Sequence, residues 1–201
     1  MQYNIKKTNV IDPCINSPEW DKAYLGNVSC QRWKEYFQPI HTTFKLLRGP
    51  KGFSVLMHTD EKNLRAEHTE QNSMVCEDSC MEFFFNPDPS DVKYINFEVN
   101  PKNVLHLSIG DDVNERQLIA VDRKIFNMEA IPNDGDWTLK FYIPDSFLLK
   151  YFDRISDICV GNFYKCGDFT DHPHYASWKE VETEEPNFHT PRYFGILENK
   201  G

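Results

Sequence analysis

Glycine is scarce in this chain, which has nine glycines in 201 residues, few of them clustered. The sequence contains no glycine-rich phosphate loop, no GxSxG motif and no HExxH motif. Nucleotide binding therefore has no sequence motif to support it. The serine hydrolases that carry GxSxG and the zinc proteases that carry HExxH likewise have no motif here.

Long apolar runs are also missing. No run approaches the roughly 18–20 apolar residues that a membrane-spanning helix needs, so we expect no membrane span. The first residues, MQYNIKKTNVIDP, contain no hydrophobic core of a signal peptide. We therefore expect a protein that is either cytoplasmic or secreted with its leader removed.

Basic residues are in the minority. The chain has 22 Lys and Arg against 31 Asp and Glu, which gives a formal net charge of −9 and a pI near 5.2. Because phosphate backbones are bound by basic surfaces, we expect no nucleic-acid partner. The charge by itself identifies no other partner.

Alanine and leucine are sparse, whereas 15 phenylalanines and 12 prolines favour strands over helices. Short apolar stretches separated by turn sequences predict strands at Thr42–Leu47, Gly52–Thr59, Leu64–Thr69, Cys80–Asn86, Tyr94–Asn100, Val104–Ser108, Gln117–Asp122, Trp137–Ile143, Ile158–Cys166, Ser177–Val181 and Tyr193–Leu197. One helix is predicted at Ser146–Phe152, with Ser146 as its N-cap. We therefore predict an all-β fold in one domain spanning residues 1–201: an antiparallel, jelly-roll-like β-sandwich with one or two short helices.

The six cysteines permit disulfides without requiring them. On a single strand, Cys76 and Cys80 would lie about 13 Å apart, which is too far for them to bond to each other. None of the cysteine spacings matches a paired zinc knuckle. We expect free, mostly buried thiols.

The segment Glu77–Pro101 is the most informative stretch, because it predicts two strands whose polar residues alternate with apolar ones. Side chains on a strand alternate between its faces, so each polar set lies on one side. The polar positions are Glu82, Asn86, Asn96, Glu98 and Asn100, and the apolar positions facing the core are Phe83, Phe85, Phe97 and Val99. If the two strands pair, one face of the sheet carries a row of carboxylates and amides.

Several short motifs occur in a recognisable order: PEWDKA, GFSVLMHTD, DSCMEFFFNP, YINFEVNP, WTLKFYIP and a Pro-x-x-Phe-Gly ending at Pro191–Gly195. From about Asp12 to Leu197, this order resembles the family 9 carbohydrate-binding modules and their uncharacterised bacterial relatives. The resemblance implies an antiparallel β-sandwich related to DOMON domains. It also implies non-catalytic binding of a sugar or short oligosaccharide, often beside a glycoside hydrolase, with structural calcium in some members.

The resemblance further implies a sugar slot between two tryptophans, with charged residues on the hydroxyls. Glu82 matches the family glutamate after an Asp-Ser pair, and Phe188 stands in place of the tryptophan before Pro-x-x-Phe-Gly. Around Val75–Cys76, where the other tryptophan would stand, there is no aromatic residue, and Glu98 stands where the family uses an arginine. We therefore expect the fold to be kept and the sugar slot to be altered.

Three interpretations of Glu82 and Glu98 are open from the residues themselves. Carboxylates can accept charge-assisted hydrogen bonds from sugar hydroxyls. Two carboxylates roughly 5–9 Å apart could also act as the pair of a glycosidase, although nothing else in the sequence supports catalysis. The third interpretation is a solvated face, or ion pairs with Arg65 or Lys165.

Phe188 and His189 lie in a loop flanked by prolines, and loops often carry binding residues. Aromatic faces can stack on the C–H faces of sugars, so these two residues are candidates for the binding platform. Tyr175, Trp178 and Tyr193 are further aromatic candidates. The alternative for each is a place in the core, which we favour for Trp178.

Arg65 and Lys165 are basic residues within or beside apolar strands, where charges are seldom buried without a partner. Each is expected either to reach the acidic face as an ion pair or to point at a ligand. Both are therefore candidates for the site.

No metal site is predicted. The histidines of DFTDHPH, His172 and His174, lack a regular spacing and are interpreted as part of a polar loop. Calcium needs oxygen ligands, but its candidate donors form no recognised loop pattern; they are Asp88, Asp91, Asp111 and Asp112. We expect no cofactor, and structural calcium is left open by the resemblance.

Together, these patterns predict non-catalytic carbohydrate binding at a polar and aromatic site on the sandwich. The expected site residues are Glu82, Glu98, Arg65, Lys165, Phe188 and His189. Two alternatives stay open: a glycoside-active enzyme that uses Glu82 and Glu98, and a sandwich domain that has lost ligand binding.

Overall fold

The computed structural model describes residues 1–111 and 115–199, which contain thirteen strands, one α-helix and five 3-10 helices. The strands are β1 (Gln2–Lys7), β2 (Gly26–Val28), β3 (Thr42–Gly49), β4 (Gly52–Thr59), β5 (Cys80–Asn86), β6 (Tyr94–Val99), β7 (Leu105–Gly110), β8 (Gln117–Leu118), β9 (Glu129–Asn133), β10 (Asp136–Pro144), β11 (Ile158–Gly167), β12 (His174–Ser177) and β13 (Gly195–Asn199). The helices are α1 (Asp145–Leu148), η1 (Pro18–Lys22), η2 (Lys34–Tyr36), η3 (Val75–Glu77), η4 (Arg123–Phe126) and η5 (Pro191–Tyr193).

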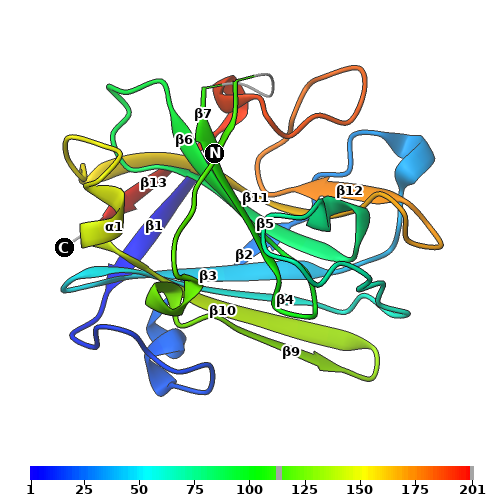
Figure 1. Ribbon diagram of the computed structural model, residues 1–201, viewed down its shortest axis with the longest axis horizontal. Coiled ribbons are helices and arrows are strands. Elements are labelled where there is room, and N and C mark those ends of the chain that lie inside the picture. The colour runs from blue at the N-terminus through cyan, green and yellow to red at the C-terminus, as the bar shows by residue number, and fades with distance from the viewer. Residues whose placement is uncertain (112–114, 200–201) are drawn as a thin grey trace.

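The strands form two layers that are joined through β1 (Figure 1). Their hydrogen-bonded order is β8-β7-β6-β5-β11-β13-β1-β3-β4-β10-β9, with β12 beside β11 and β2 beside β3. β1 pairs in parallel with both β13 and β3, and the other strand pairs are antiparallel. The predicted all-β sandwich is confirmed, and the two parallel pairings of β1 add to it.

The space between the layers is filled by large side chains at alternate strand positions. Phe83 of β5 stacks on Phe163 of β11 with ring centroids 4.2 Å apart, and Phe163 stacks on Phe44 of β3 at 3.7 Å. All three rings are buried, so this column of rings connects the two layers through the core. Burial of such rings is a major stabilising contribution of the core.

The outer face of β5 and β11 is covered as well. Phe84 of β5 and Tyr164 of β11 belong to a second apolar cluster whose other members include Trp33, Val75, Phe188 and Phe194 from segments outside these strands. Every residue of β5 is therefore buried. The polar row expected on this face is consequently covered by protein instead of facing bulk water.

The segment Leu64–Thr69 does not form the strand that we predicted. The buried carboxylate of Asp78 accepts the backbone N–H groups of Glu67 and His68 at 2.9 and 3.0 Å. Arg65 Nε lies 3.5 Å from the same carboxylate. A side chain therefore takes the hydrogen bonds that a neighbouring strand would have supplied.

The strand predicted at Ser177–Val181 is displaced toward the N-terminus, to β12. Beyond β12, the Asn162 side chain donates to the carbonyl of Lys179 and accepts from its N–H, both at 2.9 Å. These bonds replace the strand ladder at that point, which explains why the strand ends.

The predicted helix at Ser146–Phe152 is much shorter in the structure. α1 covers Asp145–Leu148, and Pro144, not Ser146, occupies the N-cap position. The N–H of Asp145 donates to the carbonyl of Lys51 at 2.8 Å. The helix is thereby tied to the turn between β3 and β4.

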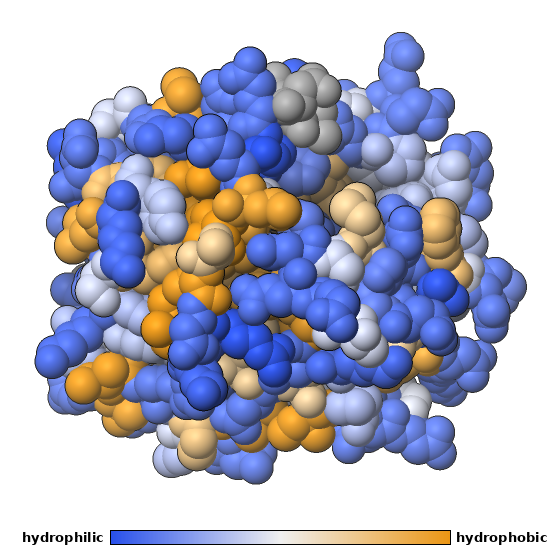
Figure 2. Space-filling view, viewed as in Figure 1, coloured by the Kyte–Doolittle hydropathy of each residue, from blue (hydrophilic) through white to orange (hydrophobic). Residues whose placement is uncertain are grey.

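The face of the molecule seen in Figure 2 is largely hydrophilic and is interrupted by an apolar patch left of its centre. In the part of the chain that the structure describes, no helix has the length and apolar character to cross a bilayer. The six cysteines are free thiols, of which Cys80, Cys159 and Cys166 are buried and Cys14 is exposed.

Candidate ligand-binding cavity

A cavity of about 590 Å³ lies on the outer face of the sheet formed by β5, β6, β7 and β11. Its sheet wall carries Glu82, Phe84, Glu98, His106, Ser108 and Cys166. The remaining wall comes from Met74, Cys76, Arg116, Asp168, Tyr175 and the segment Glu185–His189. The strands therefore position Glu82 and Glu98, and the segment that covers the sheet supplies Phe188 and His189.

A second hollow, of about 370 Å³, is lined by residues that include Asp60, Glu61, His172 and His174, the last of which begins β12. None of its lining residues is a phenylalanine, tyrosine or tryptophan. It therefore offers no flat apolar surface on which a ring could stack, so we take the larger cavity as the candidate site.

An acid pair forms the floor of the cavity. Glu82 and Glu98 stand directly opposite each other on β5 and β6 and are only 3% and 7% exposed. Cys166 Sγ donates to Glu82 Oε1 at 2.9 Å, and Asn96 Nδ2 donates to Glu98 Oε1 at 2.7 Å.

Burial raises the pKa of both carboxyl groups, and the neighbouring charge of Glu98 raises that of Glu82 further, to well above its usual value. The pair therefore keeps a proton to higher pH than exposed carboxylates do. A protonated carboxyl group can donate a hydrogen bond as well as accept one.

Arg116 supplies positive charge to the cavity. Its guanidinium lies 4.2 Å from the centre of the Tyr94 ring, and it donates to Ser108 Oγ at 3.0 Å and to the side chain of Asn96. Sequence reasoning missed this residue because it stands in the charged stretch GDDVNERQ, which has no alternating pattern.

Neither basic residue predicted for the site lies in this cavity. Lys165 stands between Tyr164 and Cys166 on β11, so strand alternation directs it to the opposite face from Cys166. There its buried Nζ contacts Glu61 and the ring of His174, each at 2.8 Å. Arg65 is held beside Asp78, as described above.

Both aromatic residues predicted for the site do line the cavity. Phe188 stacks on Tyr164 with ring centroids 4.1 Å apart, and His189 packs on Phe84 at 4.8 Å. His189 Nδ1 lies 2.8 Å from the hydroxyl of Tyr94. These contacts fix both rings in place. Of the further aromatic candidates, Tyr175 lines the cavity, whereas Trp178 lies in the core.

Asp168 adds a third carboxyl group that sequence reasoning assigned to a polar loop. Its backbone N–H donates to the carbonyl of Cys76 at 2.9 Å, which holds the end of β11 against η3. Burial raises the pKa of Asp168, although a hydrogen bond from Tyr175 opposes the shift.

Two of the four aspartates considered for calcium have other partners. Asp88 accepts from Ser90 and Arg154, and Asp91 pairs with Lys93, while Asp112 lies outside the described residues. Among residues 1–111 and 115–199, one group of three His, Cys, Asp or Glu side chains comes close enough to hold a metal ion; its members are Cys80, Glu82 and Cys166.

The structure is thus a two-layered β-sandwich domain with a polar, aromatic-lined cavity on one outer face. The chain belongs to Carbohydrate-binding family 9, whose sequence model matches residues 19–199. The predicted family resemblance is thus confirmed. A comparison with curated proteins gave no significant match.

Solved structures share the fold over almost the whole chain. A Bacteroides uniformis ATCC 8492 protein, provisionally described as carbohydrate-binding, is 25% identical with a TM-score of 0.85, covering 99% of both chains. A family 9 module from Caldicellulosiruptor kristjanssonii in complex with glucose gives a TM-score of 0.72 at 11% identity, covering 100% of this chain and 96% of the other. A family 9 module from the same organism in complex with cellotriose gives a TM-score of 0.70 at 13% identity, covering 100% of this chain and 94% of the other.

Proposed function

We propose that the cavity binds a sugar or a short oligosaccharide without catalysing a reaction on it. One observation carries the proposal: an acid pair, an arginine and aromatic rings line one cavity of about 590 Å³ in a member of a carbohydrate-binding family. Two solved structures of this fold are complexes with glucose and with cellotriose.

The lining supplies both interactions that a sugar needs. The rings of Phe188 and Tyr175 offer apolar surface to the C–H face of a pyranose. Arg116 offers charge-assisted hydrogen bonds, the stronger kind, to its hydroxyls. Glu98 and Asp168 add carboxyl groups that can accept or, when protonated, donate a hydrogen bond. The volume is in the range of small-molecule sites.

The geometry favours binding over glycoside hydrolysis. The two carboxyl groups of a glycosidase flank the scissile bond. Glu82 and Glu98 are instead cross-strand neighbours on one face of one sheet, where Cβ atoms are about 5 Å apart and side chains run parallel. Both groups therefore approach a ligand from the same side. Their spacing would by itself suit a retaining glycosidase, and it is this shared direction of approach that disfavours one.

Calorimetric titration with glucose, cellotriose and a panel of other monosaccharides tests the proposal. We expect saturable binding of at least one sugar, and we expect Glu98→Gln and Phe188→Ala each to weaken it at least tenfold, since each removes a cavity contact. Glu129→Gln on β9 and Phe169→Ala, an exposed ring, are matched controls that should leave affinity unchanged.

Binding of no sugar by the folded protein would support the alternative that this sandwich has lost its ligand. Turnover of aryl glycosides that disappears in Glu98→Gln would instead support the enzyme alternative. An association with a glycoside hydrolase, which the family resemblance implies, stays a prediction.

A further inference from the structure

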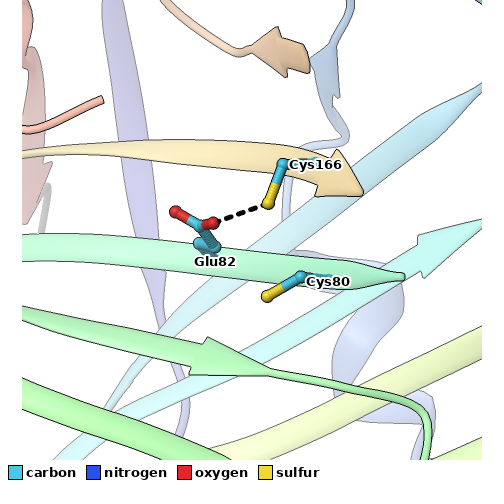
Figure 3. A group of neighbouring side chains, drawn as sticks. All are labelled: Cys80, Glu82 and Cys166. Atoms are coloured by element: carbon cyan, nitrogen blue, oxygen red, sulfur yellow. Dashed lines mark hydrogen bonds between the residues drawn. The ribbon is translucent and has the colours of Figure 1, made fainter. Parts of the chain in front are cut away.

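Two cysteines and a glutamate converge on neighbouring strands (Figure 3), and two of the three line the cavity. Cys80 of β5 and Cys166 of β11 are directly paired across the antiparallel strands. Glu82 stands two residues after Cys80 and therefore on the same face. The two sulfur atoms and a carboxylate oxygen all lie within 4.8 Å of one another.

These distances suit a tetrahedral metal centre with small adjustments. Zinc binds thiolate sulfur at about 2.3 Å and carboxylate oxygen at about 2.0–2.2 Å, so its donors stand roughly 3.5–3.8 Å apart. The Cys166 Sγ to Glu82 Oε1 distance of 2.9 Å would have to open by about half an ångström. The other distances would close by at most about 1 Å.

The position of the group gives a metal ion both an entry path and an open coordination site. All three residues are buried, with Cys80 at 0% and Cys166 at 2% exposed. Glu82 and Cys166 nevertheless line the cavity, whereas Cys80 lies behind them. A bound ion would therefore have protein on one side and the cavity on the other, as in sites that keep one position for water or a ligand.

The donor set also selects the kind of ion. Thiolates favour soft or borderline ions such as Zn²⁺, whereas Ca²⁺ and Mg²⁺ prefer sites built from oxygen. Binding the ion releases the protons of the two thiols to solvent. The two thiolates and the carboxylate then carry three negative charges in a buried place, of which a divalent cation offsets two. This set differs in residues and chemistry from the aspartates considered for calcium.

We propose that Cys80, Cys166 and Glu82 form a binding site for Zn²⁺ whose fourth position faces the cavity. The proposal does not depend on sugar binding, because the three donors come from the protein alone.

The test uses the full chain, reduced and stripped of metal, and titrates it with Zn²⁺ or Co²⁺ without any sugar. We expect one metal ion per chain and, with Co²⁺, the thiolate charge-transfer and visible bands of a tetrahedral site. Cys80→Ser, Cys166→Ser and Glu82→Gln should each weaken Zn²⁺ binding at least tenfold. Cys159→Ser, which changes a buried cysteine outside the group, should not.

Alkylation of the wild-type protein gives a second readout that needs no variant. Cys80 and Cys166 are buried and react only when the site opens. Bound Zn²⁺ should therefore slow their alkylation relative to the metal-free protein, as mass spectrometry can show, and leave the rate at exposed Cys14 unchanged. A Co²⁺ spectrum without thiolate bands, or protection that does not include Cys80 and Cys166, would overturn the proposal.

Discussion

At the scale of single residues, His174 is a buried histidine with a close partner at each ring nitrogen. It is 3% exposed, and its Nε2 accepts a hydrogen bond from the Lys165 ammonium at 2.8 Å, while Nδ1 lies 2.9 Å from the carbonyl of His172. Burial, and then the charge of Lys165, lowers the pKa of His174 to about 4.

This shift predicts a loss of stability in mild acid. An unfolded histidine has a pKa of about 6.5, so between pH 6.5 and 4 the unfolded state binds more protons than the folded one. Stability that is complete above pH 6.5 should therefore fall toward pH 4, by about 3 kcal/mol from this residue. Urea unfolding at a series of pH values measures the slope, which His174→Gln should flatten and exposed His41→Gln should not. Equal slopes in His174→Gln and the parent would contradict the prediction.

The residues of the cavity show what a sequence can predict about a site. Alternation and the loop position placed Glu82, Glu98, Phe188 and His189 among the candidates, and the structure brings these four to one cavity. Lys165 was a candidate for the site because of its charge. Side chains alternate along a strand, however, so Lys165 points to the opposite face of β11 from its cavity-lining neighbour Cys166. Finding Arg116 would have required knowing that it contacts Tyr94 on β6 and Ser108 on β7, which are long-range contacts that no local pattern contains.

At the scale of elements, the side chain of Asn162 determines where the β11–β12 ladder ends. It is fully buried and bonds both backbone groups of Lys179. Asn162→Ala should lower the free energy of unfolding by about 1–3 kcal/mol, because it leaves the partly buried N–H and carbonyl of Lys179 unpaired. Asn27→Ala, at an exposed position of β2, should change stability by less than about 0.5 kcal/mol. Denaturant unfolding of both variants checks this, and similar midpoints would contradict it.

The elements that the sequence predicted best are those with long apolar alternation, such as β4, β5, β6 and β10. β9 was missed because it is an exposed edge strand that contains Pro132, although Asp134-Gly135 just after it is a strong hairpin signal. Gly135 adopts a φ of 97°, which glycine favours. β1 was missed because only Tyr3 and Ile5 mark its buried face. Residues 64–69 are the opposite case, a strand that was predicted and does not form. Their apolar pattern alone does not reveal that the Asp78 carboxylate accepts hydrogen bonds from their backbone N–H groups.

At the scale of the whole molecule, β1 is the strand through which the hydrogen-bonded order passes from one layer to the other. Residues 2–5 pair with β13, and residues 6–7 pair with β3. The Tyr3 hydroxyl also accepts a hydrogen bond from the backbone N–H of Leu46 at 3.1 Å. The two layers should therefore unfold together, because loosening β1 removes support from both.

Ile5→Ala tests this coupling, since Ile5 is fully buried in the core between the layers. The truncation should lower the free energy of unfolding by about 2–5 kcal/mol, the usual range for a large core aliphatic changed to alanine. Ile158→Ala on β11 removes the same atoms from a side chain that is 51% exposed, so it should cost less than about 0.5 kcal/mol. Unfolding followed by tryptophan fluorescence and by far-ultraviolet circular dichroism should give coincident transitions in all three proteins. If Ile5→Ala separated the two transitions, the layers would be independent units and the coupling role of β1 would be wrong.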